Sequence, residues 1–258
     1  MGMIPLKRQQ QLVDLLRHEP GLAVPDLAAR LGVSPGTVRN DLRTLAQTGA
    51  VVRVRGGGTV LPQTPAFAGP AFTARARENE SAKRAMARLA AALVQDGDSI
   101  LLDASTSVYH LGYFLQNRHN LRVVTNGIEV ARLLAQNPTH LVMLVGGTLR
   151  AGAQSVTGPW SLRYLDEVCT RFAFVSGSGF TPESGLTEVD LYEAEFRVRA
   201  IGAATQVIAL IDAGKYGKID LTPSVKPERI THIFTDNDLS PEWVKRLERA
   251  GLPFTLCE

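Results

Sequence analysis

The segment Ser34–Leu45, with the sequence SPGTVRNDLRTL, constrains the fold of this chain more than any other part. Ser34 is a good helix N-cap, and Pro35 suits the first helical position because its missing N–H would be unpaired there anyway. At 100° per residue, three apolar side chains fall on one stripe that must face a core, namely Val38, Leu42 and Leu45. The segment therefore predicts a short amphipathic helix.

Polar side chains occupy the rest of this predicted helix. Asn40 and Arg43 lie opposite the apolar stripe, with Arg39 and Thr37 on its flanks. A short helix with an apolar back and an Asn/Arg/Thr front can place base-reading groups in the major groove of DNA. We expect Arg39, Asn40 and Arg43 to face base edges, with Ser34 or Thr37 on phosphates.

The flanking sequence predicts a winged helix-turn-helix around this helix. Leucine spacing indicates two earlier helices, at about 7–18 and from about Pro25, and Gly32-Val33 suits the tight turn before the third helix. Two strands, 50–55 and 59–61, joined by glycines 56–58, would form a wing that brings Arg53 and Arg55 to DNA phosphates. The alternative is a small helical subdomain with a solvated arginine face and a hairpin.

The charge distribution fits a DNA-binding N-terminus. Residues 1–60 hold eight Lys and Arg against four acidic residues, whereas the rest of the chain holds 20 basic and 21 acidic residues. The net charge of +3 therefore comes from the N-terminal part, as expected where one module meets a polyanion.

Several other classes of protein are not indicated. The first residues lack the apolar core of a signal peptide, and no apolar run approaches membrane-spanning length. Two cysteines, Cys169 and Cys257, make no disulfide framework, and no Cys/His cluster has metal-ligand spacing. We expect a cytoplasmic protein without metal, cofactor or membrane partner.

A Pro-, Ala- and Gly-rich stretch from Pro62 to Pro70 indicates a linker. It predicts an N-terminal domain at 1–61, a linker at 62–74 and a C-terminal domain at 75–258. In the C-terminal domain, short Val-, Leu- and Ile-rich strands alternate with helices. The expected strands are 99–103, 121–125, 141–145, 171–176, 206–212, 230–235 and 253–256, and the expected helices are 79–95, 107–116, 128–136, 188–203 and 240–250. This alternation predicts an α/β fold with a mostly parallel sheet covered on both faces.

Ligands of such sheets bind beyond the carboxyl ends of the strands. Polar or glycine residues follow each of five expected strands, as DASTS (103–107), TNG (125–127), GGT (146–148), SGSG (176–179) and DAGKY (212–216). Hydroxyls and backbone N–H groups at the start of helix 107–116 suit a phosphate, and Lys215 could supply positive charge. Taken singly, Ser105 or Ser107 could merely cap the helix, Gly146-Gly147 could be a plain turn and Lys215 a solvated lysine.

These motifs resemble the DeoR family of bacterial transcription regulators over nearly the whole chain. In the N-terminal half the resemblance lies in Arg8, Leu12 and Leu16, in Ser34-x-x-Thr37-Val38-Arg39-Asn40-Asp41-Leu42, and in Arg53-Val54-Arg55-Gly56-Gly57. In the C-terminal half it lies in Asp103-x-Ser105-Thr106-Ser107, Thr125-Asn126, Gly146-Gly147, Asp212-x-x-Lys215-Tyr216 and Thr235-Asp236. The chain departs from the family pattern at Asn40, Arg55, Ala104, Ala213 and Gly214.

The resemblance implies a regulator, most often a repressor, whose C-terminal domain is related to ribose-5-phosphate isomerase and the coenzyme A transferases and senses a phosphorylated sugar without converting it. The implied partners are an operator in double-stranded DNA, the sugar phosphate and further copies of the chain in a dimer or tetramer. The effector site implied by the resemblance and the strand ends comprises Asp103, Ser105, Thr106, Ser107, Thr125, Asn126, Gly146, Gly147, Gly177, Asp212 and Lys215.

Two other functions stay open at this point. An active sugar-phosphate isomerase with a DNA-binding appendage would need a carboxylate base near a carbon-bound proton. The candidates near the relevant strand end are Glu183, Glu188, Asp190, Glu193 and Glu195. Alternatively, the C-terminal domain could serve only to oligomerise a DNA-binding protein.

Overall fold

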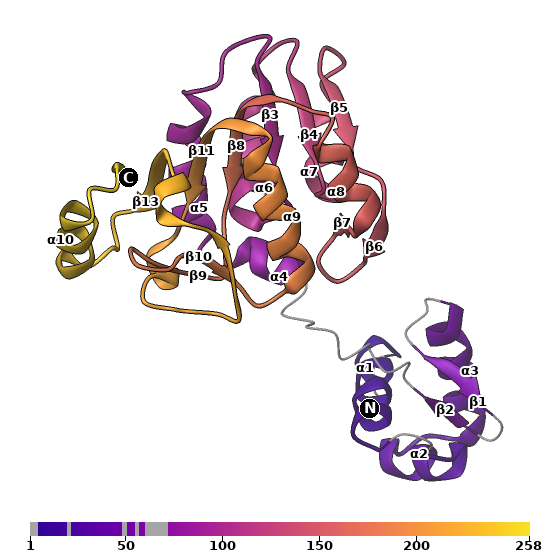
Figure 1. Cartoon of the computed structure of the whole chain (residues 1–258). Coiled ribbons are helices and arrows are strands. Elements are labelled where there is room, and N and C mark those ends of the chain that lie inside the picture. Colours follow the sequence, from indigo (N-terminus) through magenta and orange to yellow (C-terminus); the bar gives the residue numbers. More distant parts are fainter. Residues whose placement is uncertain (1–4, 20–21, 48–50, 55–56, 60–71) are drawn as a thin grey trace. The chain divides into compact units, whose positions relative to one another are not determined.

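The computed structural model of the chain describes residues 5–19, 22–47, 51–54, 57–59 and 72–258 (Figure 1). The chain divides into two compact units, residues 1–68 and 69–258. Each unit has its own buried core, so each is described separately.

Three helices build the N-terminal unit, namely α1 (Pro5–His18), α2 (Val24–Leu31) and α3 (Pro35–Gln47). The apolar stripe predicted for α3 packs into the core, where Val38 and Leu42 are buried against Leu12 of α1 and Leu27 of α2. Gly32 ends α2 with φ of +63°, a left-handed conformation that glycine adopts without strain. The predicted helix-turn-helix is therefore confirmed.

A two-stranded hairpin follows α3, but the bounds of its strands differ from the prediction. Strand β1 (Val52–Val54) pairs with β2 (Gly57–Thr59), so that Arg53 lies opposite Gly58 and Val54 opposite Gly57. Placing the three glycines in the connection was wrong, because ladder pairing with β1 draws two of them into β2. Only residues 55 and 56 separate the strands, and they lie outside the described residues.

The C-terminal unit is built on a seven-stranded sheet in the order β14-β13-β11-β8-β3-β4-β5, and every neighbouring pair is parallel. The strands are β3 (Ser99–Leu102), β4 (Arg122–Thr125), β5 (Leu141–Leu144), β8 (Thr170–Val175), β11 (Ala204–Leu210), β13 (His232–Asp236) and β14 (Phe254–Cys257). From β3 the chain moves outward through β4 and β5, and from β8 it moves the other way. The order of strands thus reverses between β3 and β8, which is where open α/β sheets bind ligands.

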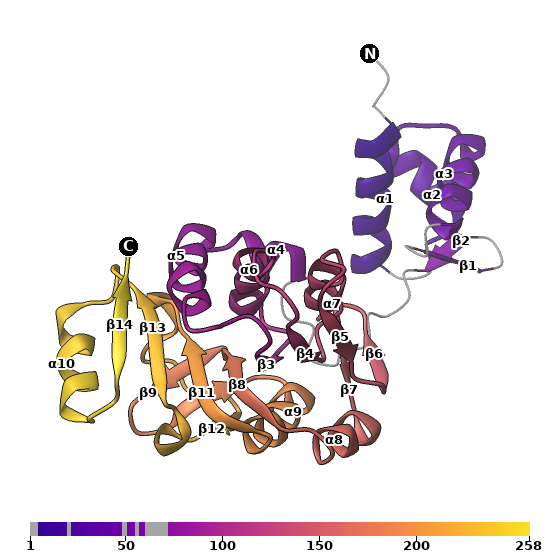
Figure 2. The same ribbon diagram turned by 90° about the horizontal axis from the view of Figure 1, so that it is seen from above.

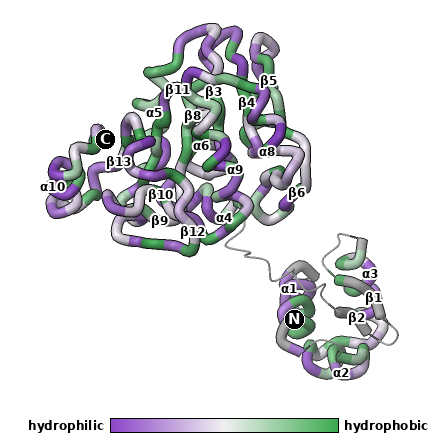
Figure 3. The backbone as a smooth tube through the Cα atoms, viewed as in Figure 1, coloured by the Kyte–Doolittle hydropathy of each residue, from purple (hydrophilic) through white to green (hydrophobic). Residues whose placement is uncertain are grey.

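Helices cover both faces of this sheet (Figure 2). One face carries α5 (Glu80–Ala91), α6 (Thr106–Leu115) and α7 (Ile128–Leu134), and the other carries α8 (Pro159–Leu165) and α9 (Leu191–Gly202). Alternate strand residues enter different cores: Ile100 and Leu102 pack with Met86 of α5, whereas Leu101 packs with Phe196 of α9. Figure 3 shows hydrophobic stretches both on the central strands and on covering helices such as α6. The predicted parallel α/β architecture is confirmed.

Several elements were absent from the prediction. They are α4 (Phe72–Arg77), α8, the β6–β7 hairpin (Thr148–Arg150 and Ser155–Thr157), a three-stranded sheet of β9 (Gly179–Thr181), β10 (Gly185–Glu188) and β12 (Thr222–Val225), and the 3-10 turns η1 (Ala213–Lys215) and η2 (Pro227–Arg229). Strands of three or four residues are too short to show an alternating pattern. Helix α4 packs beside α6 and runs across the boundary expected at residue 74.

Two predicted helices differ from the structure at one end. The helix expected from 188 begins at Leu191, because Glu188 pairs with β12 and Asp190 caps α9 by accepting from the N–H groups of Tyr192 and Glu193. The helix expected over 79–95 begins at Glu80, directly after its N-cap Asn79, as predicted, but it ends earlier, at Ala91. The last helix, α10 (Pro241–Arg249), falls within the expected range 240–250 and lies beside β14 (Figure 2).

Candidate functional site

The polar front of α3 is exposed. Ser34 caps the helix by accepting a hydrogen bond from the N–H of Thr37 at 3.1 Å. Arg39, Asn40 and Arg43 are all exposed, and Arg43 donates to Asn40 Oδ1 at 3.3 Å. Of the predicted contact residues on α3 and its cap, Ser34, Arg39, Asn40 and Arg43 are exposed, and Thr37 is half-buried.

A partly buried ion pair holds α3 against α1. Arg8 donates from Nε to Asp41 Oδ2 at 2.6 Å and from Nη2 to Oδ1 at 3.1 Å, and Gln9 adds a third bond to the same carboxylate. The Asp41 side chain is 4% exposed. Arg8 and Asp41 were singled out only as family-like residues; their pairing is a tertiary contact that no local pattern signals.

The wing arginines stay predictions. Arg53 lies in β1, where the structure describes only its backbone, and Arg55 lies outside the described residues.

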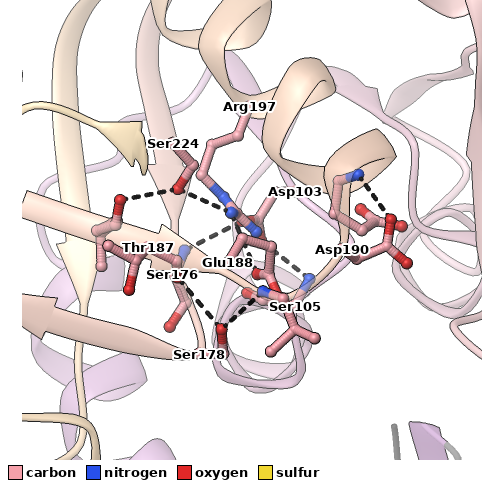
Figure 4. Close-up of polar contacts among 12 residues, drawn as sticks. Asp103, Ser105, Ser176, Ser178, Thr187, Glu188, Asp190, Arg197 and Ser224 are labelled. Carbon is pink, nitrogen blue, oxygen red and sulfur yellow. Dashed lines mark hydrogen bonds and ion pairs between the residues drawn. The ribbon is translucent and has the colours of Figure 1, made fainter. Parts of the chain in front are cut away.

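In the C-terminal unit, Asp103 joins the two strands at which the sheet order reverses (Figure 4). Its Oδ1 accepts from the N–H of Ser105 at 2.9 Å, and its Oδ2 accepts from the N–H of Ser176, after β8, at 3.0 Å. Arg197 of α9 donates to the same Oδ2 at 3.0 Å. Arg197 also contacts Glu188 at 3.3 Å and Ser224 at 3.1 Å, and it is 3% exposed. The network fixes the loop that follows β3.

Lys215 points at the start of α6. Its Nζ lies 2.8 Å from Ser176 Oγ, 3.4 Å from Ser107 Oγ and 3.2 Å from Asp212 Oδ2. Thr106, the first residue of α6, is buried. Ser105 is the helix cap, since its Oγ accepts from the N–H of Val108. The structure thus brings together the ends of β3, β8 and β11 around one ammonium group.

Asp212 is also held by an amide side chain. Asn79 donates to Asp212 Oδ1 at 3.1 Å. Burial by itself would raise the pKa of Asp212, but the charge of Lys215 and its hydrogen bond leave that pKa below its usual range. Nearby, Lys83 donates to the carbonyl oxygens of Arg75 and Glu78 at the end of α4, and burial followed by the charge of Lys215 lowers its pKa to about 8.

The remaining predicted residues contact other elements. Thr125 Oγ1 accepts from the N–H of Gly127, and Gly146 accepts from Ser161 of α8. A Cβ on Gly147 would lie 2.5 Å from the carbonyl oxygen of Thr157, and one on Gly177 would lie 2.8 Å from that of Thr187. These glycines permit close packing on β7 and β10, and their nearest contacts are not with Lys215 or α6.

Asn126 lies in a polar cluster that the sequence did not indicate. Glu193 of α9 accepts from Asn126 Nδ2 at 3.3 Å and from the hydroxyl of Ser155. Arg150 of β6 forms an ion pair with Asp190 and lies 3.7 Å from Glu193. Burial raises the pKa of Glu193, opposed by the Ser155 hydrogen bond and by the charge of Arg197.

Four of the five carboxylates considered as a base are engaged elsewhere. Glu188 pairs with Arg197, Asp190 caps α9, Glu193 belongs to the polar cluster and Glu183 pairs with Arg246 on the surface. Glu195 is exposed on α9.

Ser176 and Arg197 are absent from the predicted effector set. Ser176 begins the strand-end motif SGSG (176–179), from which only Gly177 was chosen. Arg197 lies on the same buried stripe of α9 as Ala194, Ala200 and Ile201. A charged residue on such a stripe is rarely buried without a partner, so the sequence could have indicated a buried ion pair.

A surface cavity of about 570 Å³ lies beside α4 and α6. Its walls include Phe72, Tyr109, His110 and Arg132, and none of the predicted effector residues lines it. Within the described ranges, no group of His, Cys, Asp and Glu is arranged to hold a metal ion, and no helix is both long and apolar enough to cross a membrane.

The chain matches two family models in sequence order. Residues 8–64 match the DeoR-like helix-turn-helix domain, and residues 78–237 match the DeoR C terminal sensor domain. The HTH-type transcriptional regulator GolR of Listeria innocua is 32% identical over 99% of this chain and 100% of its own length. The Glycerol-3-phosphate regulon repressor of Escherichia coli K12 is 26% identical over 89% of this chain and 90% of its own.

Among solved structures, a D-ribose-5-phosphate isomerase in complex with phospho-erythronic acid aligns with 53% of this chain and 54% of its own, at 14% identity and a TM-score of 0.41. The two family models and the full-length similarity to a named regulator agree with the exposed helix-turn-helix and the parallel α/β unit. The chain belongs to the DeoR family of transcriptional regulators.

Proposed function

We propose that this protein represses genes of carbohydrate metabolism and that a phosphorylated sugar bound to the C-terminal unit controls its affinity for DNA. The observation that carries the proposal is the position of Lys215, whose ammonium group lies within hydrogen-bond distance of Ser107 at the start of α6 and of Ser176 after β8. This chain is also similar to a protein named the Glycerol-3-phosphate regulon repressor, and that name, which contains a phosphorylated polyol, supports an effector of the same class.

This site offers positive charge and hydrogen-bond donors. A phosphate matches both, because it is an anion with several acceptor oxygens. The N-terminus of α6 presents unpaired N–H groups and the positive end of the helix dipole, and the hydroxyls and Lys215 add further donors. Charge-assisted hydrogen bonds of this kind are stronger than those to a neutral hydroxyl. Of the predicted effector residues, Ser105, Thr106, Ser107 and Lys215 surround the phosphate, Asp212 holds the Lys215 ammonium group in place, and Asp103 fixes their loop. Thr125, Asn126, Gly146, Gly147 and Gly177 frame the sugar side.

The N-terminal unit binds the operator through α3 and the wing. Arg39, Asn40 and Arg43 read base edges, and phosphates are held by Ser34, Thr37, Arg53 and Arg55. Two-fold operators favour an even number of subunits, so the protein acts as a dimer or tetramer in the cytoplasm. Residues 62–74 link the domain at 1–61 to the sensor at 75–258.

Effector and operator are coupled through one equilibrium. A sugar phosphate that prefers one arrangement of the sensor domains changes the affinity for DNA by the same factor by which DNA changes the affinity for the sugar phosphate. The protein needs no chemical step for this function.

The test is a thermal-shift screen of the intact protein against phosphorylated sugars and their unphosphorylated forms, with product analysis of every hit. We expect a phosphorylated hit that is recovered unchanged and that releases the protein from its operator in a gel-shift assay. An isomerised product would establish an enzyme, and a complete lack of phosphorylated hits would refute the effector class.

A further inference from the structure

We infer that β5, the outermost strand of the parallel sheet, pairs with β5 of a second copy of the chain, so that the two sheets join across a two-fold axis. The inference names the surface through which two copies assemble. It rests on the proposed function for the even number of copies, and its three exposed side chains, Leu141, Leu144 and Trp160, lie outside the proposed effector site.

Strand β5 has a partner strand on one side only. It stands last in the order of the sheet and, within the described residues, pairs with β4 alone (Figure 1). The N–H groups of Leu141 and Val145 donate to carbonyl oxygens of the segment 121–125 at 2.8 and 2.9 Å. Because backbone groups of a strand alternate between its two sides, the N–H groups of Val142 and Leu144 point away from β4. The described residues offer these two groups no acceptor.

This edge carries apolar side chains and lacks the usual protection. Leu141 is 57% exposed and Leu144 is 44% exposed. The strand sequence LVML contains no charge and no proline, which are the residues that commonly protect an edge strand from further pairing. The edge is therefore suited to accept another strand.

A large aromatic side chain lies near the end of the same strand. Trp160 of α8 is 70% exposed. The hydroxyl of Ser161, next to it, donates to the carbonyl oxygen of Gly146 at 2.7 Å, and Tyr164 of α8 contacts Met143 Sδ at 3.2 Å. Helix α8 thus packs along β5 and brings Trp160 close to the exposed edge.

The three side chains form a patch of the size expected for the core of an interface. Together Leu141, Leu144 and Trp160 expose on the order of 300 Å² of mostly apolar surface, and patches of this size often mark interaction sites. A standard interface buries roughly 800 Å² on each partner, with an apolar core and a polar rim. The backbone of β5 and the polar residues around it would supply the remaining area.

The unpaired backbone groups select a second copy as the partner. A strand edge is satisfied by another strand edge, and the sheet has two edges, β5 and β14. Pairing of β5 with β14 would be a head-to-tail contact, which builds rings or open filaments. Pairing of β5 with β5 uses the same surface on both copies and closes after two. A two-fold axis normal to the sheet would make the two β5 strands antiparallel.

The test is the mass of the intact protein in solution, measured by sedimentation velocity over a range of concentrations. The wild type should sediment as a dimer or tetramer. Leu141→Lys and Leu144→Lys each place a charge on the edge and should halve that mass at the same concentration. The matched control is Leu256→Lys, which places the same charge on a leucine of β14 that is 41% exposed and should keep the wild-type mass.

A proline variant probes the backbone pairing itself. Leu144→Pro removes an N–H group that points away from β4, and edge strands tolerate proline at such positions. It should halve the mass as the lysine variants do, while its circular dichroism spectrum matches that of the wild type.

Cross-linking keeps the test decisive if one of these variants does not fold. Leu144→Cys, in a background where the exposed Cys169 is replaced by Ser, should form a covalent dimer with a short bismaleimide. Leu256→Cys in the same background should not.

The outcomes separate this inference from the proposed function. If the wild type assembles but the folded β5 variants keep its mass and Leu144→Cys does not cross-link, assembly uses another surface and the inference is wrong. If the wild type is a monomer at every concentration, the inference and the proposed even-numbered assembly both fail. The proposed effector class is tested by the thermal-shift screen and is unaffected by either result.

Discussion

Arg197 of α9 and Asp103, directly after β3, form a buried ion pair of 3.0 Å although 94 residues separate them in the chain. Asp103 in turn holds the loop before α6 and the N–H of Ser176. The pair therefore connects the helical layer on one face of the sheet with the loop that carries the proposed phosphate site.

Replacing Arg197 with Met should destabilise the protein strongly. Asp103 would stay buried without its cationic partner, and breaking a buried pair in this way costs about 3–5 kcal/mol. Arg199→Met, two residues further along α9, removes an exposed pair and should cost no more than about 1 kcal/mol. Urea unfolding of both variants measures the difference. Equal free energies of unfolding for the two variants would show that the Asp103 network does not stabilise the fold.

Removing the Lys215 ammonium should abolish the preference for phosphorylated ligands. In the wild type, a phosphorylated sugar should bind at least tenfold more tightly than the bare sugar, a difference of about 1.4 kcal/mol. Lys215→Ala should lose that preference and keep operator binding, which gives a regulator that does not respond to its effector. Calorimetry and gel shift check the two properties. The control is Lys218→Ala, an exposed lysine nearby; if it behaves like Lys215→Ala, the site is misplaced.

Arg43→Ala should lose sequence selectivity on DNA. The exposed guanidinium can bond a guanine through two donors, and each such contact is worth roughly 1–3 kcal/mol. Fluorescence anisotropy with operator and scrambled duplexes measures the loss. Arg249→Ala, an exposed arginine of α10, controls for charge alone. Unchanged selectivity in Arg43→Ala would contradict the assignment of α3 as the recognition helix.

Arg55→Ala should act differently from Arg43→Ala. A phosphate contact carries no sequence information, so affinity for operator and scrambled DNA should fall by a similar factor. The slope of log affinity against log salt should also decrease by about 1. Titrations at several salt concentrations measure this slope. A selective loss on the operator would instead place Arg55 at a base edge.

The buried Lys83 should make stability depend on pH. Its pKa is about 8 in the folded protein and 10.5 for the free side chain, so between these values the unfolded chain binds more protons. The contribution of Lys83 to the free energy of unfolding should therefore rise with pH through this window and be lowest below pH 8. The measurement is the difference in unfolding free energy between wild type and Lys83→Met from pH 7 to 10. The exposed Lys245 provides the control in Lys245→Met. A pH-independent difference would contradict the lowered pKa.

The parts of the fold that were predictable are those with local signals. The apolar stripe of α3, the glycine turn after α2 and the long apolar strands all follow from residue spacing. The β6–β7 hairpin and the sheet of β9, β10 and β12 were missed because their sequences, TLR, SVT, GFT, GLTE and TPSV, lack the apolar runs that marked equally short strands of the parallel sheet, such as SILL in β3. Their tertiary pairing decides that they are strands.

The residues of the candidate site also fall into those that a local signal predicts and those that it does not. Lys215, Ser107 and Asp212 were predictable because each follows a strand whose carboxyl end meets the same edge of the sheet. The partners of Asn126 were not, since Glu193 and Ser155 reach it from other elements. Gly147 and Gly177 lie so close to neighbouring strands that a Cβ would collide there, which shows that a glycine after a strand can serve packing, whereas Gly146 has open space at its Cβ position and accepts a hydrogen bond from Ser161 of α8.

The reversal of strand order between β3 and β8 also bears on how the protein is made. The two central strands are paired, and Asp103 bonds Ser176 across 73 residues of sequence, so the middle of the sheet closes only after β8 has been synthesised. Contacts in the N-terminal unit are far more local, and local contacts form fast. During synthesis the helix-turn-helix is complete long before Lys215 leaves the ribosome. A chain interrupted between the two units would therefore contain the helix-turn-helix and lack the C-terminal sensor domain.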